Sequence, residues 1–320
     1  MNNIKIYLGP FQGITDATYR STIVECFGGI DIAMTPFVTN VNEKKPKSVQ
    51  TWDLWTENNT KVHTIPQMLS KDANEMIAVA NVCEQFGYDE INWNLGCPFP
   101  RVANKKRGSG ILIDPELVSS LLKEVISNIN IDLSIKCRLG YKDPKELEKL
   151  IPIFNSNKIK ELTIHPRIGK QLYKGTADPI AFKNYMKDIE LPIVYNGDIF
   201  SVEYFQELNE LFEGKINKWM LGRGILSDPF LAEKIKNDSN LSTDEKLERL
   251  RTFLQLLFER HYSRFKNVNN ALNRMKELWS YLANSFDDPQ KVFKEVRKCK
   301  TEEEYQKGLH NIFTNYHWVK

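Results

Sequence analysis

Short apolar stretches alternate with longer segments of helical periodicity over the first two thirds of the chain. The intervening segments, such as KDANEMIAVANVCEQFG and DPELVSSLLKEVISNI, have the spacing of amphipathic helices. The apolar stretches have the length and composition of strands, and they begin at Ile4, Ile30, Val62, Glu90, Ile131, Glu161, Leu191 and Lys218. Eight strand-then-helix units predict an α/β fold, the closed (β/α)8 TIM barrel, which takes about 250 residues.

A doubly wound open sheet is the alternative architecture for alternating strands and helices. Such a sheet usually has fewer strands. A dinucleotide-binding sheet would also show GxGxxG after the first strand, and this sequence has GPFQG there instead. The barrel is therefore the favoured prediction.

The strand pattern stops near residue 240, and only helical patterns follow. Ser242 with Glu245, and Thr301 with Glu304, have the spacing of capping boxes at helix starts. The segments NALNRMKELWSYLANSF and PQKVFKEVRKCK continue helically between them. We predict two domains: a catalytic barrel over residues 1–238 and a small C-terminal helical bundle over residues 239–320.

Composition narrows the class of protein. Of the 320 residues, 41% are apolar and 27% charged, as in ordinary folded domains. No apolar run approaches the ~20 residues needed to span a bilayer, and the N-terminus does not have a signal-peptide pattern, so we expect a cytoplasmic protein with no membrane contact. The five cysteines and five histidines show no metal-ligand or disulfide spacing. We therefore expect no metal.

Several candidate chemical groups stand where the predicted strands end, which is where TIM barrels hold their active sites. GPFQG ends the first strand, and its glycines allow close backbone approach. Gln67 and Lys136 lie within apolar strands, where polar groups need partners. A planar heterocycle such as a flavin would supply those partners. His165 ends the sixth strand, where a lone histidine is more often structural than catalytic.

Two glycine-containing loops follow the last two strands. NGDIF begins at Asn196, and GRGIL contains Gly222 and Arg223. Loops at these positions of a barrel commonly bind phosphate through backbone N–H groups and a helix N-terminus. Arg223 adds a fixed positive charge. The pair of loops predicts a phosphorylated cofactor such as FMN.

Cys97 lies in NWNLGCPFPRV, between a glycine and a proline at the end of the fourth strand. Three roles are open for its thiol. A nucleophile would need a base, and His165 is the one histidine at a strand end. A proton donor would need only reach and a suitable pKa. An inert, buried cysteine is the third reading.

The motifs GPFQGITD, IPQM, NWNLGCPFPRV, GSGIL, IKCRLG, HPRIGKQLYKG, YNGDIF and LGRGIL occur in this order. Taken together they resemble the tRNA-dihydrouridine synthases, flavoenzymes that reduce selected uridines in RNA. The resemblance covers the barrel from about Lys5 to Pro229, and the tail fits the RNA-binding domain of that family. Within the tail, NRMKELWSYLANSF is most similar to the branch that modifies position 16 of tRNA. A ribosomal RNA target stays open.

The resemblance implies a reaction and a role for each matching residue. NADPH would reduce FMN, hydride would pass to carbon-6 of an everted uracil, and Cys97 would protonate carbon-5. The residues implied to surround FMN are Pro10, Phe11, Gln12, Gln67, Lys136, His165, Asn196, Gly197, Asp198, Gly222 and Arg223. Those implied to orient the base are Asn94, Arg167 and Tyr173, with Arg138 at the same rim.

Basic residues follow the second, fourth and sixth strands, so they should gather around the mouth of a parallel barrel. Because phosphates attract such residues, this arrangement agrees with the tRNA partner that the resemblance implies. The bases expected to contact RNA include Lys105 and Arg107 in the loop NKKRGSG, and Arg274, Lys276 and Arg297 on the tail. We expect the protein to act as a monomer.

Two other functions remain open from the sequence. The first is an FMN barrel that acts on a free pyrimidine, which would have no use for a basic mouth. The second is a non-catalytic RNA-binding protein with a relic barrel, which would bind no flavin.

Overall fold

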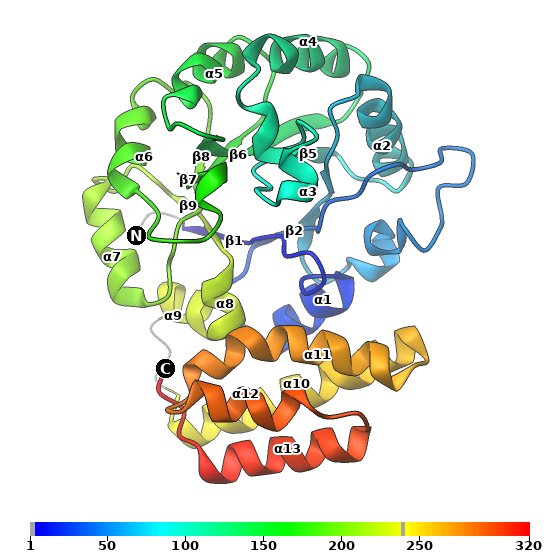
Figure 1. The fold of residues 1–320 in the computed structure, drawn as a ribbon, viewed down its shortest axis with the longest axis vertical. Helices are drawn as coiled ribbons and strands as arrows, with labels where there is room; N and C mark the ends of the chain where they lie inside the picture. Colours follow the sequence, from blue (N-terminus) through cyan, green and yellow to red (C-terminus); the bar gives the residue numbers. More distant parts are fainter. Residues whose placement is uncertain (1–3, 238–240) are drawn as a thin grey trace.

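Parallel strands and helices alternate through the first part of the fold in a computed structural model, which describes residues 4–237 and 241–320 (Figure 1). Every predicted strand is present. The strands are β1 (Lys5–Leu8), β2 (Ile32–Met34), β3 (His63–Ile65), β4 (Gln67–Met68), β5 (Glu90–Leu95), β6 (Asp132–Gly140), β7 (Leu162–Ile168), β8 (Ile193–Tyr195) and β9 (Lys218–Leu221).

The strands close into a barrel. The sheet order is β3-β2-β1-β9-β8-β7-β6-β5-β4, and its two ends, β3 and β4, are separated only by Pro66. Proline has no N–H to donate, so the predicted third strand is divided there. β3 pairs with β2 and β4 pairs with β5. The eight-stranded TIM barrel is therefore confirmed, with its third strand in two halves.

Helices surround the barrel and place each following strand (Figure 1). Five of them begin at an Asp or Ser side chain that accepts a hydrogen bond from a backbone N–H three residues later, which stabilises the helix start. The helices of this part are α1 (Ala17–Cys26), α2 (Ala73–Gln85), α3 (Pro100–Ala103), α4 (Pro115–Ile126), α5 (Glu146–Asn155), α6 (Pro179–Met186), α7 (Val202–Leu211), α8 (Arg223–Ser227) and α9 (Leu231–Asn237).

Four further helices form a bundle beside the barrel (Figure 1). They are α10 (Thr243–Phe265), α11 (Val268–Leu282), α12 (Pro289–Arg297) and α13 (Glu302–Asn315). Both predicted capping boxes are present, at Ser242 and Thr301. The predicted domain boundary at residues 238 and 239 lies outside the described residues. No helix within 4–237 or 241–320 combines the length and apolar content needed to cross a membrane.

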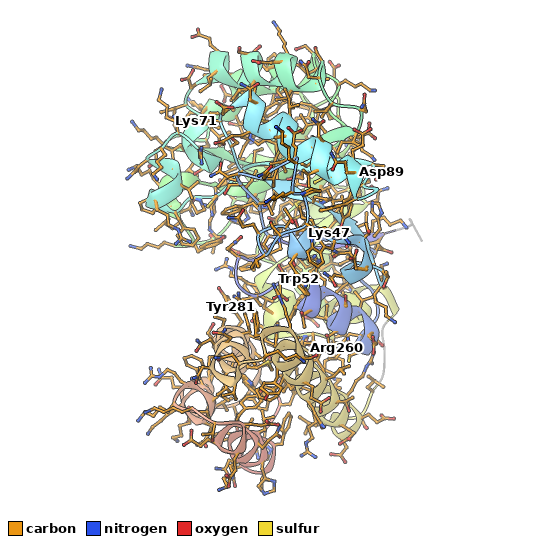
Figure 2. The ribbon with its side chains drawn as sticks, turned by 90° about the vertical axis from the view of Figure 1, so that its right-hand side faces the viewer. Lys47, Trp52, Lys71, Asp89, Arg260 and Tyr281 are labelled. Atoms are coloured by element: carbon orange, nitrogen blue, oxygen red, sulfur yellow. The ribbon has the colours of Figure 1, made fainter. Side chains whose placement is uncertain are left out.

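The bundle packs directly on the barrel. Phe27, which follows α1, lies edge-on to Phe253 of α10 with ring centroids 5.1 Å apart. Arg264 of α10 pairs with Asp16 at 2.5 Å, and its guanidinium carbon lies 3.5 Å from the ring centre of Trp52. Figure 2 shows Trp52 near this junction. One apolar core therefore runs from the barrel helices into the bundle.

We expect Arg264→Ala to lower the free energy of unfolding by about 2–4 kcal/mol, because it leaves the buried carboxylate of Asp16 without its cation and removes a cation–π contact. Urea unfolding followed by circular dichroism measures this. Lys307→Ala is the matched control, because Lys307 and Glu303 form an ion pair that is exposed to water. Equal stability of both variants would contradict a stabilising role for Arg264.

The buried imidazole of His261 in α10 predicts a loss of stability in acid. Burial lowers the pKa of His261 to about 4, whereas the unfolded chain titrates near 6.5. The unfolded state therefore binds a proton more readily between these values, and stability falls as pH drops from about 6.5 to 4. We expect His261→Leu to reduce this loss by up to about 3 kcal/mol, measured as urea unfolding at pH 7 and pH 4.5. An identical loss in the variant would refute this assignment.

Candidate active site

A cavity opens where the barrel strands end, as expected for this fold. Its volume is about 220 Å³, far more than the roughly 10–15 Å³ that one water needs. The structure brings fifteen of the predicted site residues to its wall. They are Pro10, Phe11, Gln12, Gln67, Asn94, Cys97, Lys136, Arg138, His165, Tyr173, Asn196, Gly197, Asp198, Gly222 and Arg223.

The turn after β5 holds the thiol of Cys97. The side-chain oxygen of Asn94 accepts hydrogen bonds from the backbone N–H groups of Gly96 at 3.0 Å and Cys97 at 2.9 Å. The carbonyl of Cys97 accepts from the backbone N–H and the hydroxyl of Ser109. Gly108 has φ +56°, and a Cβ there would lie 2.6 Å from the same carbonyl. These contacts fix the backbone on both sides of the thiol.

The environment of Cys97 keeps its thiol protonated. The residue is only 9% exposed, and this burial raises the pKa of the thiol, which the positive charges of Arg138 and Lys136 only partly oppose. A thiol with a raised pKa carries its proton at neutral pH and can donate it. Such a group suits a proton donor better than a thiolate nucleophile.

A network of side-chain amides crosses the base of the cavity. The side-chain amide of Gln67 donates to the side-chain oxygen of Asn92 at 2.9 Å. The side-chain amide of Asn94 donates to the side-chain oxygen of Gln67 at 2.7 Å. Asn92 in turn donates to Ser134. Asn94 lines the cavity as predicted, but its oxygen and one of its N–H groups are already engaged. Its clearest contribution is to orient Gln67 and the Cys97 turn.

Lys136 projects from β6 into the cavity. Its backbone pairs with β5 and β7, but among the described residues its ammonium group forms neither a hydrogen bond nor an ion pair. The surrounding protein displaces water and lowers the pKa of Lys136 to about 8, and repulsion from Arg138 adds to this effect. An ammonium group in this position favours an anionic ligand. The pyrimidine end of a reduced flavin fits this requirement.

His165 is held in one tautomer. Its Nδ1 donates to the carbonyl oxygen of Asn196 at 2.5 Å, so Nε2 is free to accept, and the guanidinium of Arg167 lies 3.3 Å from it. Burial lowers the pKa of His165 well below its usual value, and the nearby charges of Arg138 and Lys136 act in the same direction. The ring is therefore neutral. It has no contact that would make it the base for Cys97.

Arg167 differs from its predicted role. Its guanidinium is buried and does not line the cavity, because it forms a two-pronged ion pair with Asp198 and donates to the carbonyl of Gly175. Burial would raise the pKa of Asp198, but Arg167 and Arg223 outweigh it and lower that pKa. The structure thus places Arg167 behind the wall, where it positions Asp198 rather than a base.

The loops after β8 and β9 approach their neighbours closely at the end of the cavity where the sequence predicts a phosphate. A Cβ on Gly224 would clash with the carbonyl of Ile199, and one on Gly222 would lie 2.8 Å from the ring of Phe11. Arg223 pairs with Asp198 at this end. A backbone cradle beside a guanidinium has the donor groups that a phosphate needs, so the residues present fit FMN.

Arg138 is anchored by three carbonyls. It donates to Gly96 at 3.0 Å, Ile168 at 2.9 Å and Leu172 at 2.6 Å. It therefore ties the Cys97 turn to the loop after β7 and contributes a buried positive charge to the wall.

The lysines and arginines predicted to contact RNA lie outside the cavity. Arg107 pairs with Glu75 at 3.2 Å. Arg274 donates to the backbone carbonyl of Gly13 at 2.6 Å, so this arginine holds the loop after β1. The three that complete the set are Lys105, Lys276 and Arg297, none of which lines the wall.

Sequence reasoning missed several aromatic residues of the cavity wall. Phe37, Phe99 and Phe200 come from loops after β2, β5 and β8, and Tyr281 comes from α11 of the bundle. The ring of Tyr281 lies edge-on to Phe11 with centroids 5.9 Å apart, and Figure 2 shows it at the junction with the barrel. The adjacency of Phe99 to the cysteine motif was an available signal. The docking of α11 had no local signal.

The described residues contain no group of three or more His, Cys, Asp or Glu side chains that could hold a metal ion. The wall instead offers one protonated thiol, one unpaired ammonium and a set of amide and backbone donors. This chemistry suits the binding of a planar phosphorylated cofactor and the transfer of a proton.

Comparison with known proteins agrees with the fold and extends it. The old yellow enzyme homologue from Zymomonas mobilis superposes with a TM-score of 0.53 and 11% identity, covering 74% of this chain and 90% of its own, which shows a common fold. A tRNA-dihydrouridine(16) synthase of Neisseria meningitidis serogroup A is 28% identical, covering 95% of this chain and 93% of the relative. One of Vibrio parahaemolyticus is 26% identical, covering 92% of each.

The match to a family description is equally extensive. Residues 7–316 match "Dihydrouridine synthase (Dus)", so both the barrel and the bundle fall within the family pattern. The chain belongs to the dihydrouridine synthase family.

Proposed function

We propose that this protein reduces specific uridines in tRNA to 5,6-dihydrouridine, with FMN as its cofactor and NADPH as the reductant. Family membership and the names of the similar proteins support the reaction class. One observation carries the proposal: a protonated thiol, Cys97, and an unpartnered ammonium, Lys136, line the same cavity.

FMN, when bound, supplies a hydride for carbon-6 of the uracil ring. Lys136 and Gln67 would hold the flavin ring, and His165 would fix the wall beside it. The neutral imidazole adds no further positive charge next to Lys136. The backbone around Asn196, Gly197, Asp198, Gly222 and Arg223 would hold the phosphate, and Pro10, Phe11 and Gln12 would contact the flavin ring. Cys97 holds the proton that carbon-5 of the uracil receives, and its raised pKa keeps that proton available at neutral pH.

The substrate is tRNA with the target uridine turned out of its stack, because a stacked base hides both reacting carbons. Tyr173 is placed to contact that base at the mouth, since it lines the cavity between the guanidinium groups of Arg138 and Arg223. Lys105, Lys276 and Arg297 contact phosphates outside the mouth. The similar proteins named for position 16 support the same position here.

The two-domain division is part of this proposal: a catalytic barrel over residues 1–238 and an RNA-binding bundle over residues 239–320. The protein acts as a monomer, because one chain carries all the groups invoked. A cytoplasmic location follows from a tRNA substrate.

The function is tested with purified protein, FMN, NADPH and an unmodified tRNA transcript. We expect dihydrouridine at one position of the D-loop, mapped by mass spectrometry. Bulk ribosomal RNA and free uracil or orotate serve as alternative substrates in the same assay. Reduction of a free pyrimidine with no change in tRNA would contradict the proposal, as would modification of ribosomal RNA alone.

We expect Cys97→Ala to slow uridine reduction by at least ~10²-fold, the scale of general-acid catalysis. Flavin content and the rate of flavin reduction by NADPH should stay unchanged, because the thiol acts only in the second half of the reaction. Stopped-flow absorbance separates the two halves. Cys26→Ala is the matched control, since Cys26 lies at the end of α1 and does not line the cavity. Normal dihydrouridine formation by Cys97→Ala would remove this thiol from the mechanism.

A further inference from the structure

Exposed aromatic rings gather at the mouth of the cavity. Among the described residues, four aromatic side chains are more than one third exposed: Phe99 at 48%, Tyr173 at 40%, Phe200 at 37% and Tyr262 at 45%. The first three line the cavity, and Tyr262 does not. Large apolar rings are costly to expose, so a cluster around one opening marks a binding surface.

Phe99 differs from the other two rings in having no partner. The rings of Tyr173 and Phe200 each lie near the guanidinium of Arg223, at 4.8 and 5.7 Å, and Tyr173 also lies near Arg138. Within the part of the chain that the structure describes, Phe99 takes part in no contact with another ring or with a cation over its face. Its exposed surface is therefore available to a ligand.

The backbone around Phe99 is fixed before any ligand arrives. Pro98 and Pro100 flank it and restrict the chain. Its carbonyl accepts hydrogen bonds from the backbone N–H groups of Val102 at 2.8 Å and Ala103 at 2.9 Å, so Phe99 caps the short helix α3. A ring with two rotatable bonds on a rigid turn loses little conformational entropy when it stacks on a ligand.

Two basic residues follow Phe99 closely in the sequence. Arg101 and Lys105 follow within six residues, both are exposed, and neither forms an ion pair with any described residue. Lys106, in contrast, is paired with Asp114. A free aromatic face next to unpaired cations is the arrangement by which proteins hold single-stranded nucleic acid, with the base on the ring and the phosphate on the cation.

The geometry points to Phe99 as a stacking platform for the unpaired nucleobase adjacent to the everted uridine, with Arg101 and Lys105 at its phosphates. Phe99 follows Cys97 by two residues and lines the same cavity, so we expect its ring to lie beside the reacting uracil rather than on it. This inference rests on the proposed function and deepens it, because it names a contact outside the reduced base that selects an unpaired neighbour.

The test compares Phe99→Ala, Phe99→Leu and Phe99→Trp in the full chain loaded with FMN. We expect Phe99→Ala to weaken tRNA binding and raise the KM for tRNA by roughly 5- to 100-fold, with kcat changed less than threefold. Phe99→Trp should restore wild-type values because it keeps a ring, and Phe99→Leu should not. Tyr262→Ala is the matched control, with similar exposure and no place in the cavity wall, and should bind as the wild type does.

Salt dependence separates stacking from phosphate contacts. Phe99→Ala should lower affinity at every salt concentration and leave the slope of log affinity against log salt unchanged. Lys105→Ala should reduce that slope by about 0.7–0.9, the share of one phosphate contact. A changed slope in Phe99→Ala would overturn the stacking assignment.

Three further results would overturn the inference. The first is a tRNA affinity of Phe99→Ala equal to that of the wild type, and the second is wild-type affinity in Phe99→Leu. The third is slower reduction of the flavin by NADPH in Phe99→Ala, which would assign the ring to binding of the nicotinamide. The proposed function fails separately, if the wild-type protein makes no dihydrouridine. If the wild-type protein makes dihydrouridine and Phe99→Ala binds tRNA as well as the wild type does, this inference is refuted and the proposed function is not.

Discussion

Two hydrogen bonds from backbone N–H groups to the side chain of Asn94 are the contacts on which the site depends. They turn the chain sharply after β5, so that Cys97 faces the cavity instead of continuing the strand. The same amide is joined to Gln67 on β4, and Asn92 beside it is joined to Ser134 on β6. Polar groups in a buried site are stable only when their partners are in place. The barrel therefore fixes the thiol through three neighbouring strands.

The positively charged side chains in and behind the wall also differ in whether they have partners within the protein. Arg138 and Arg167 are buried, and carbonyls or Asp198 anchor their guanidinium groups, so they define the shape of the site. Lys136 has no such partner among the described residues and keeps its charge for a ligand. Two kinds of cation thus serve one site: arginines in or behind the wall that hold loops together, and a lysine in the wall whose ammonium group is available to a ligand. Sequence position alone does not distinguish them.

Local patterns were sufficient for the architecture and for much of the wall. The period-two and 3.6-residue patterns identified each strand and the main helices. Because TIM barrels hold their active sites where the strands end, the sequence also predicted that Cys97, Lys136 and His165 lie in one site. The roles of Arg107, Arg167 and Arg274 could not be predicted, because each depends on a partner brought near by folding: Glu75, Asp198 and Gly13. Pro66 did carry a signal, since proline interrupts a strand ladder, and it accounts for the division of the third strand.

The contact of the bundle with the loop after β1 limits how the two domains of this enzyme can evolve. Arg274 holds the carbonyl of Gly13, and Tyr281 lies against Phe11, so α11 forms part of the wall of a chamber built otherwise from the barrel. The part proposed to grip RNA and the part proposed to hold the cofactor are therefore not separable modules. A recombined protein carrying a bundle from a distant relative would inherit a misshapen chamber, and new substrate preference would have to evolve together with the first loop of the barrel.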